Sequence, residues 1–217
     1  FTPTEVAASH LKCEGVDAAS IIPVGDVMYD VALYHGARVD QGGRVIKQLG
    51  LTPGNYVLAT IHRAENTDNA ERLSSIVKAL SKLSQDVQVV WPLHPRTRGV
   101  LAAMGILDSL ARHVHLIDPV GYLDMVQLEK YACLIATDSG GVQKEAFFYR
   151  VPCVTLRDET EWVELVEAGW NRLAPPSSTS DLHSILTSAI GSLGVEIEPY
   201  GRGNAAQRIV EKLLEQM

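Results

Sequence analysis

The chain has 217 residues, of which 46% are hydrophobic and 21% charged, a composition typical of a globular protein with a sizeable core. Its net charge of −7 disfavours nonspecific binding to nucleic acid or to membrane surfaces, so an anionic ligand needs local N–H groups and a few arginines. No apolar stretch reaches the roughly 20 residues of a membrane span, and no signal peptide is visible.

The cysteines and the first residues indicate the setting of the chain. The number of cysteines is odd, and all three lie in mostly apolar surroundings: Cys13, Cys133 and Cys153. This favours reduced thiols and a cytoplasmic location. The chain opens without a methionine, on FTPTEVAASHL. We therefore expect it to be a fragment of a longer protein.

Six short apolar runs predict β-strands. They are rich in Val and Ile, and each ends at Gly, Pro or a polar residue. In chain order they are IIPVG at 21–25, NYVLATI at 55–61, DVQVVWPL at 86–93, HVHLIDP at 113–119, CLIATD at 133–138 and PCVTLRD at 152–158. Because strands that are apolar along their whole length are buried on both faces, these runs predict a sheet covered by helices on both sides.

Amphipathic segments separate and follow these strands. In 69–85, Leu73, Ile76, Val77 and Leu80 fall on one helical face. Further helices are expected at 122–132, 139–149, 161–169, 178–193 and 204–217. Strand and helix alternate every 15 to 30 residues, roughly, which predicts right-handed crossovers and a doubly wound parallel sheet, a Rossmann-like α/β fold.

Four polar motifs stand at the ends of predicted strands: TIHRAEN at 60–66, PLHPRT at 92–97, TDSGG at 137–141 and LRDETEW at 156–162. In open α/β sheets, ligands bind beyond the carboxyl ends of the strands. The motifs therefore mark the edge of the sheet where a site is expected.

The TDSGG motif suits an anion. Ser139, Gly140 and Gly141 stand where a helix begins, and a helix N-terminus carries roughly half a positive charge, which favours a phosphate. Glu145, one turn further on, is suited to two ribose hydroxyls. A diphosphate followed by a ribose fits this helix, and the alternative is an N-cap with a flexible turn.

The other motifs are less specific. His62 and Arg63 emerge at the same edge, where Arg binds phosphate oxygens and His stabilises charge or moves a proton. The alternative is a histidine bonded to backbone carbonyls beside a solvated arginine. His94, between prolines, is as consistent with a structural role as with a functional one. Arg157 and Asp158 are either part of the site or a buried pair at the strand end.

Several common sites are not supported. The sequence has no G-x-G-x-x-G after a strand, no G-x-x-x-x-G-K-[ST] and no G-x-S-x-G, which argues against nicotinamide dinucleotide binding, a P-loop and a serine hydrolase. The histidines have no H-E-x-x-H or cysteine pairing, so we expect no metal site and no cofactor.

Taken together, the motifs resemble the non-hydrolysing UDP-N-acetylglucosamine 2-epimerase family, in its order and spacing. The matching segments are VGDVMYD at 24–30, TIHRAEN at 60–66, PLHPRT at 92–97, LIDPVGYLDMVQL at 116–128 and TDSGGVQKEA at 137–146. The resemblance implies the C-terminal half of a two-domain GT-B enzyme. Residues 1–25 would then be a remnant of the N-terminal domain with the interdomain connection, 26–200 the UDP-binding domain and 201–217 a C-terminal helix.

The resemblance also implies roles. Ser139, Gly140 and Gly141 would take the diphosphate of UDP, and Glu145 the ribose. Val120 and Met125 would read the uracil, and His62 would be catalytic beside the diphosphate. Enzymes of this family eliminate UDP from the substrate to leave a glycal, and then add UDP back with C2 inverted. The product serves the synthesis of surface polysaccharide precursors. The carboxylates that move the C2 proton belong, in the family, to the N-terminal domain, so we expect this chain alone to be inactive. The resemblance also implies a homodimer for the full-length enzyme.

Three departures bear on the substrate. Ala64 stands where the family commonly has a second Arg, Met125 where it has Phe, and Trp162 where it has an Arg near the sugar or phosphate. The TEWVE stretch resembles the branch that acts on UDP-2,3-diacetamido-glucuronic acid, which is the alternative substrate, although Trp162 is equally consistent with a core residue of its helix. The donor domain of a GT-B glycosyltransferase and a non-catalytic nucleotide-sugar sensor are further alternatives.

Overall fold

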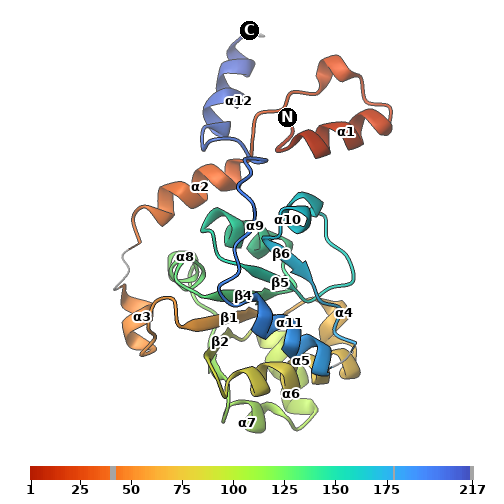
Figure 1. Ribbon diagram of the computed structural model, residues 1–217. Helices are drawn as coiled ribbons and strands as arrows, with labels where there is room; N and C mark the ends of the chain where they lie inside the picture. The colour runs from red at the N-terminus through yellow and green to blue at the C-terminus, as the bar shows by residue number, and fades with distance from the viewer. Residues whose placement is uncertain (40–42, 178, 216–217) are drawn as a thin grey trace. The chain divides into compact units, whose positions relative to one another are not determined.

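The larger of two units in the chain, Val39–Val195, is built on a six-stranded parallel sheet (Figure 1). The structure is a computed structural model that describes residues 1–39, 43–177 and 179–215. The strands are β1 (Tyr56–Thr60), β2 (Gln88–Pro92), β3 (His115–Ile117), β4 (Leu134–Thr137), β5 (Cys153–Thr155) and β6 (Asn171–Leu173). Their spatial order, β3-β2-β1-β4-β5-β6, reverses direction between β1 and β4. The predicted doubly wound fold is confirmed, and its switch point lies between these two strands.

Five of the six predicted strands form, and one prediction is wrong. Residues 21–25 make no strand, only an isolated bridge between Thr2 and Pro23. Proline has no N–H group to donate to a ladder, which explains why this apolar run stays outside the sheet. The edge strand β6 was not predicted, because its three residues, Asn-Arg-Leu, contain no apolar run.

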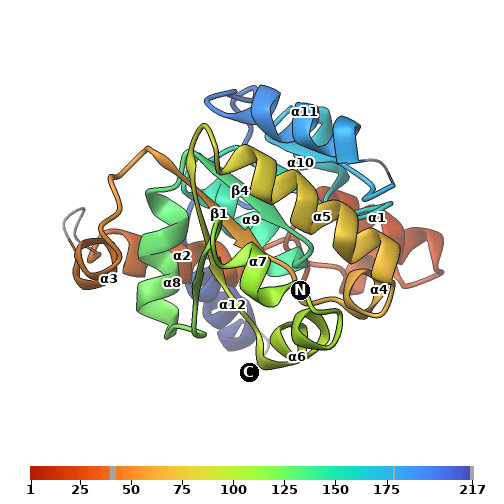
Figure 2. The same cartoon turned by 90° about the horizontal axis from the view of Figure 1, so that it is seen from below.

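Two apolar clusters cover the two faces of the sheet. In β1, Val57 and Ala59 point into one cluster, while Tyr56 and Leu58 point into the other. The first face is covered by α5 (Ala70–Leu83), α6 (Pro95–Ala103), α7 (Leu107–Leu110) and α11 (Thr179–Ala189). The second face is covered by α3 (Arg44–Gln48), α8 (Tyr122–Lys130) and α9 (Gly140–Phe148). Figures 1 and 2 show α5 and α11 side by side on the first face.

The predicted helices form, and at α5 the start is fixed by a side-chain cap. At α5, the side chain of Asn69 accepts hydrogen bonds from the N–H groups of Glu71 and Arg72. The helix expected at 161–169 shortens to α10 (Val163–Glu167), and the short α4 (Ala64–Thr67) was not predicted. Of the remaining predicted helix positions, 178, 216 and 217 lie outside the described residues.

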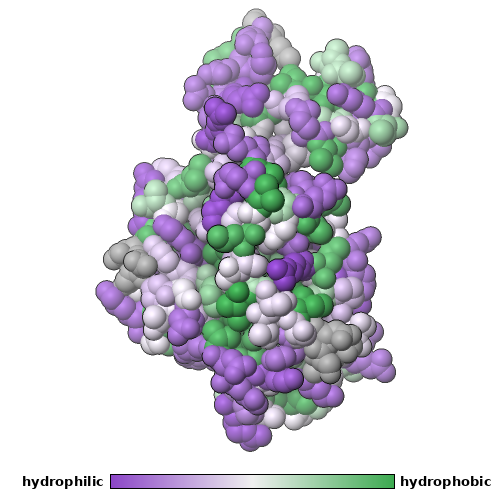
Figure 3. All heavy atoms as spheres, in the orientation of Figure 1, coloured by the Kyte–Doolittle hydropathy of each residue, from purple (hydrophilic) through white to green (hydrophobic). Residues whose placement is uncertain are grey.

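The smaller unit combines Phe1–Arg38 with Glu196–Met217. Its helices are α1 (Glu5–Cys13), the 3-10 turn η1 (Ala18–Ser20), α2 (Val27–Gly36) and α12 (Ala205–Leu214). The Asp30 carboxylate of α2 accepts hydrogen bonds from the N–H groups of Ala205 and Ala206, at 3.1 and 2.8 Å, so an acid satisfies the first turn of α12. Apolar side chains lie among hydrophilic ones on the surface of this unit (Figure 3).

The domain boundaries expected from the sequence, at 25 and 200, stay a prediction.

Within the ranges that the structure describes, every helix falls short of the combination of length and apolarity that a membrane crossing requires.

Candidate functional site

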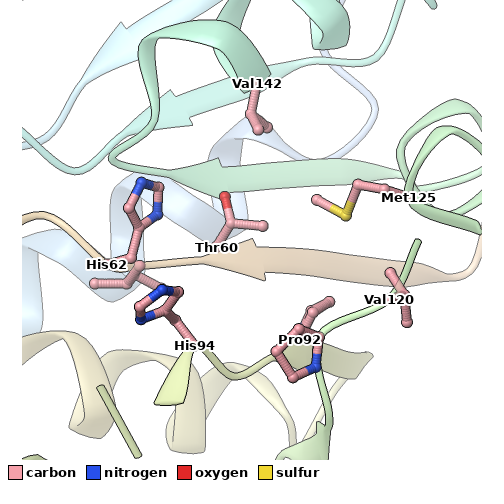
Figure 4. Close-up of a pocket in the computed structure, with 9 residues that line it drawn as sticks. Thr60, His62, Pro92, His94, Val120, Met125 and Val142 are labelled. Atoms are coloured by element: carbon pink, nitrogen blue, oxygen red, sulfur yellow. The ribbon is translucent and has the colours of Figure 1, made fainter. Parts of the chain in front are cut away.

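A pocket of about 240 Å³ opens at the carboxyl ends of β1 and β2, next to the switch point of the sheet (Figure 4). Its walls come from β1, β2, α8, α9 and the loops that follow β1, β2 and β3. The lining residues are Thr60, Ile61, His62, Pro92, His94, Pro119, Val120, Met125 and Val142. Three of the predicted site residues, His62, Val120 and Met125, are therefore brought together in one pocket.

Two histidines stand at the polar end of this pocket. The rings of His62 and His94 are 6.3 Å apart between centroids, and Figure 4 shows them near one another, after β1 and β2 respectively. Nδ1 of His94 accepts a hydrogen bond from the N–H of Arg96 at 3.2 Å, so a neutral His94 carries its proton on Nε2. His94 thus caps α6 and lines the pocket. The amino-acid sequence alone had left both a structural and a functional role open for it.

The loop that carries His62 is held by a buried carboxylate, Asp138, which directly follows β4. Asp138 is fully buried, and it accepts hydrogen bonds from the N–H of His62 at 3.1 Å and from the N–H of Arg63 at 3.0 Å. Its own N–H donates to the carbonyl of Thr60 at 3.1 Å. These bonds compensate the burial of a charge, and they tie the end of β1 to the end of β4.

The imidazole of His62 faces the same carboxylate. Nδ1 of His62 lies 3.5 Å from Oδ1 of Asp138, and the His62 side chain is 46% exposed. With Nδ1 turned to Asp138, Nε2 is the ring nitrogen left for a ligand. The guanidinium of Arg63 lies 3.6 Å from Glu65, within an exposed ion pair.

The helix that begins at the glycines, α9, meets the pocket at Val142. Ser139 is its N-cap and makes no side-chain capping hydrogen bond, so the first N–H groups of α9 are not capped by this hydroxyl. The N–H of Ser139 instead donates to Oγ1 of Thr137 at 2.9 Å. The predicted helix N-terminus thus exists beside the pocket and is suited to an anion.

Trp162 lies at the same end of α9. Its Nε1–H donates to the carbonyl of Gly140 at 2.8 Å, and the Lys144 ammonium lies 4.3 Å from the centroid of its ring. Trp162 is half-buried and forms the N-cap of α10, so it is not a core residue of that helix. Its segment is also held by Thr160, whose hydroxyl donates to Oε1 of the buried Gln143 at 2.6 Å.

Glu145 lies on α9 opposite α8, where the Tyr122 hydroxyl hydrogen-bonds to it. Burial raises the pKa of Glu145, and burial together with Glu145 raises the pKa of Tyr122 to about 12. Behind them, Glu129 of α8 is 1% exposed, and neither of its carboxyl oxygens has a hydrogen-bond partner among the described residues. Burial first and Glu145 second hold the pKa of Glu129 well above its usual range, so Glu129 is the neutral member of the pair.

The structure corrects one pairing and adds residues that sequence reasoning missed. Arg157 and Asp158 do not pair with each other: Arg157 bonds Glu161 at 2.9 and 3.0 Å, and Asp158 bonds Arg72 at 2.9 Å. Both residues lie in a bend after β5, and each side chain meets a charged partner of its own. The missed residues are Thr60, Asn66, Arg72, Asp138 and Val142. Of these, Thr60, Asn66 and Asp138 lie within the motifs at the strand ends, TIHRAEN and TDSGG, whereas Arg72 and Val142 had no such signal.

Metal binding has no cluster to support it in the part of the chain that the structure describes. There, no three side chains of His, Cys, Asp or Glu are grouped so that they could hold a metal ion.

A doubly wound parallel sheet, with a pocket at its switch point and a glycine-rich helix N-terminus beside it, defines the class of Rossmann-like proteins with a ligand site at the carboxyl edge of the sheet. The family model described as UDP-N-acetylglucosamine 2-epimerase matches residues 1–214. The chain belongs to this family, and the resemblance read from its motifs is confirmed.

Curated relatives and solved structures support membership of the same family. The chain is 48% identical over 216 residues to the UDP-2,3-diacetamido-2,3-dideoxy-D-glucuronate 2-epimerase of Pseudomonas aeruginosa, covering 98% of this chain and 58% of that protein. Its sequence is 37% identical to that of Methanocaldococcus jannaschii UDP-GlcNAc 2-epimerase, whose crystal structure in complex with UDP-GlcNAc and UDP matches this fold with a TM-score of 0.89. A Neisseria meningitidis UDP-GlcNAc 2-epimerase bound to UDP-GlcNAc is 30% identical, with a TM-score of 0.85.

These relatives are longer than the chain. The match to the two solved structures covers 99% of this chain but 60% and 61% of theirs. The chain therefore spans about three fifths of the length of the relatives that it matches.

Glu129 makes the stability of the fold depend on pH. A carboxyl with a raised folded-state pKa keeps its proton at a pH where the unfolded chain has lost it, so the free energy of unfolding falls as pH rises above the ordinary value for glutamate. In Glu129→Gln this titration is absent. We expect the free energy of unfolding, variant minus parent, to grow from about pH 5 to about pH 8, measured by urea denaturation. Glu167→Gln, on the exposed surface of α10, is the control without this trend, and a constant difference for Glu129→Gln would contradict the assignment.

Proposed function

We propose that the chain is the UDP-binding part of an epimerase that inverts C2 of UDP-N-acetylglucosamine by eliminating UDP and adding it back, in the synthesis of surface polysaccharide precursors. One observation carries the proposal: the glycine-rich N-terminus of α9 stands beside a pocket that His62, Val120 and Met125 line. The names of the relatives, all UDP-sugar 2-epimerases, support it.

The diphosphate binds at the N-terminus of α9. The N–H groups of Gly140 and Gly141 point out of a helix end that favours negative charge, and a glycine lets phosphate oxygens approach the backbone. The Ser139 hydroxyl adds a hydrogen bond. His62 meets the diphosphate through Nε2, and the neighbouring Arg63, in its exposed ion pair with Glu65, supplies positive charge.

The nucleoside extends from the diphosphate toward α8. Glu145 accepts hydrogen bonds from the two ribose hydroxyls, with its carboxylate oriented by the Tyr122 hydroxyl. Val120 and Met125 form an apolar wall for the uracil. This order places ribose and base on the α8 side of the pocket.

The chemistry follows from how weak an acid the sugar is. A C2 proton beside an amide nitrogen is not removed unaided, so the C1–oxygen bond to UDP breaks as a base takes the proton, and a glycal and UDP result. UDP then adds back to C1 while C2 receives a proton on its opposite face. Donors at Ser139, Gly140 and His62 stabilise the charge that develops on the leaving diphosphate. The groups that move the C2 proton belong to a second domain, in a GT-B arrangement, so this chain alone does not epimerise.

The second candidate is a UDP-2,3-diacetamido-glucuronate 2-epimerase. The relative that carries this name is 48% identical, and Trp162 stands where the family has an arginine. Trp162 contacts the α9 end at Gly140, so it forms a wall at the sugar side of the diphosphate. The fold would also suit the donor domain of a GT-B glycosyltransferase, but membership of the epimerase family favours an epimerase. A homodimer, a cytoplasmic location and the absence of nucleic-acid binding stay predictions.

Exchange at C2 tests the reaction itself. We expect the full-length enzyme proposed here, incubated with UDP-N-acetylglucosamine in deuterated water, to place deuterium at C2, because the proton removed there is lost to solvent before one returns. The 217-residue chain alone should place none, since it lacks the proton-moving groups. Mass spectrometry of the sugar gives the measurement, and exchange by the chain alone would refute the division of roles.

Gly140→Ala tests the diphosphate site without disturbing the fold. A Cβ at this position would lie 3.6 Å from Nε1 of Trp162, an ordinary contact, so we expect an unchanged or slightly higher melting temperature. The parent chain should bind UDP with a Kd of about tens of micromolar to millimolar, and the variant about 10-fold or more weaker, by calorimetry. Gly99→Ala in α6, in open space, is the matched control. Equal affinity of Gly140→Ala and parent would place the diphosphate elsewhere.

Trp162→Arg distinguishes the two substrates. The change removes the indole from the sugar side and adds a cation near Lys144, so we expect kcat/KM of the full-length enzyme for the diacetamido sugar to fall by roughly 10- to 1,000-fold. UDP-N-acetylglucosamine should gain or change little. Trp162→Phe keeps an aromatic ring without the Nε1–H bond to Gly140, and it separates packing from hydrogen bonding. If Trp162→Arg loses nothing on the diacetamido sugar, Trp162 has no part in substrate choice.

A further inference from the structure

The hydrogen bonds around Asp138 continue away from the pocket through Asn66. Asn66 is fully buried in α4, and its amide nitrogen donates to Oδ2 of Asp138 at 3.0 Å and to the carbonyl of Leu156 at 2.9 Å. Its amide oxygen accepts from Nε of Arg72 at 3.0 Å. Arg72 also binds Asp158 at 2.9 Å. A chain of side chains thus connects the His62 loop to the surface of α5.

Arg72 decides which way the Asn66 amide points. An arginine only donates hydrogen bonds, so the group of Asn66 that faces Arg72 must be the oxygen. The amide nitrogen then faces Asp138 and Leu156, which are both acceptors. Rotating the amide by half a turn would set its N–H groups against the guanidinium and its oxygen against a carboxylate. A single orientation of Asn66 therefore satisfies all three neighbours.

Asn66 in turn decides which oxygen of Asp138 faces the imidazole of His62, since the backbone N–H of His62 lies 3.1 and 3.2 Å from the two oxygens. Oδ2 of Asp138 is occupied by the side chain of Asn66 and by the N–H of Arg63, at 3.0 Å each. Oδ1 accepts a hydrogen bond from the backbone N–H of His62 at 3.1 Å, and it also faces Nδ1 of the His62 imidazole at 3.5 Å. A fixed carboxylate beside Nδ1 favours a proton on that nitrogen and leaves Nε2 for the ligand.

We propose that Asn66 is a positioning residue for His62, acting through Asp138, and that Arg72 positions Asn66. Asn66 touches no ligand. It holds Asp138 so that a neutral His62 carries its proton on Nδ1, and so that the imidazolium form has a carboxylate partner while Nε2–H donates to the diphosphate. The inference rests on the proposed function, which gives His62 its place beside the diphosphate.

The tautomer of His62 provides the test. The 15N signals of imidazole nitrogens distinguish Nδ1–H from Nε2–H, and His62→Gln assigns them in the 217-residue chain. In the parent without ligand we expect neutral His62 to be mainly Nδ1–H. In Asn66→Ala the population should move toward Nε2–H, because Asp138 is no longer held. Asn171→Ala is the matched control: Asn171 is equally buried, and it bonds Gln143 at 3.0 Å, away from His62.

A merely structural role of Asn66 would lower the melting temperature in both alanine variants and leave the His62 tautomer alone. That result, or an equal tautomer change in Asn171→Ala, overturns the inference. If Asn66→Ala does not fold, Arg72→Met decides: it removes the donor to Asn66 but keeps an apolar stem. A smaller shift in the same direction supports the inference, and a parent-like spectrum overturns it.

Calorimetry with UDP separates the two levels of the argument. We expect Asn66→Ala to bind UDP about 3- to 10-fold more weakly than the parent, as the loss of one positioned hydrogen bond predicts. If the parent binds no UDP, the proposed function fails, while the tautomer still reports on the link from Asn66 to His62. If UDP binds and both tautomer and affinity are unchanged in Asn66→Ala, the positioning role alone fails.

Discussion

A buried negative charge organises the ligand edge of this protein. Asp138 has no contact with solvent, and an ionised carboxylate in that position is tolerated only when N–H groups surround it. Those donors are the backbones of His62 and Arg63 and the side chain of Asn66. The need to satisfy one charge therefore shapes the loop after β1, and it holds that loop against β4 at the switch point of the sheet.

In the proposed function, the same edge shows how an acidic protein receives an anionic ligand. With a net charge of −7, the chain does not attract anions by its overall field, and it offers aligned N–H groups at the start of α9 and a few local cations instead. In the proposed function, an acid is still used where the ribose hydroxyls bind. Glu145 is oriented by Tyr122, and the neutral Glu129 behind it avoids placing two like charges between α8 and α9. Helices α8 and α9 thus carry the acids, while the loops after β1 and β2 bring the two histidines to a pocket that is otherwise lined mainly by apolar residues.

In the proposed enzyme, Trp162 links the binding of the leaving group to the choice of sugar. Its indole is bonded to the first residue of α9 and packs under Lys144, so a change in the side chain alters both the diphosphate end and the sugar wall. The buried Gln143 adds to this coupling, because it binds Thr160 of the same segment and Asn171 of β6. Substrate choice and phosphate binding therefore share one set of contacts in the proposed enzyme.

The sequence by itself determined the fold class, five of the six strands and the edge of the sheet where the site lies. Apolar periodicity and the residues at strand ends are local properties, so they can be recognised in the amino-acid sequence alone. Residues 21–25 were wrongly predicted as a strand and β6 was not predicted, because strand pairing depends on partners distant in sequence. Pro23 offers no N–H, and Asn171 pairs with Cys153 regardless of its own polarity. Only the tertiary structure decided that Asp138, Asn66 and Arg72 form one chain, that Arg157 pairs with Glu161, and that Trp162 reaches Gly140. Hydrogen bonds between loops that follow different strands depend on distances and directions that no local pattern encodes.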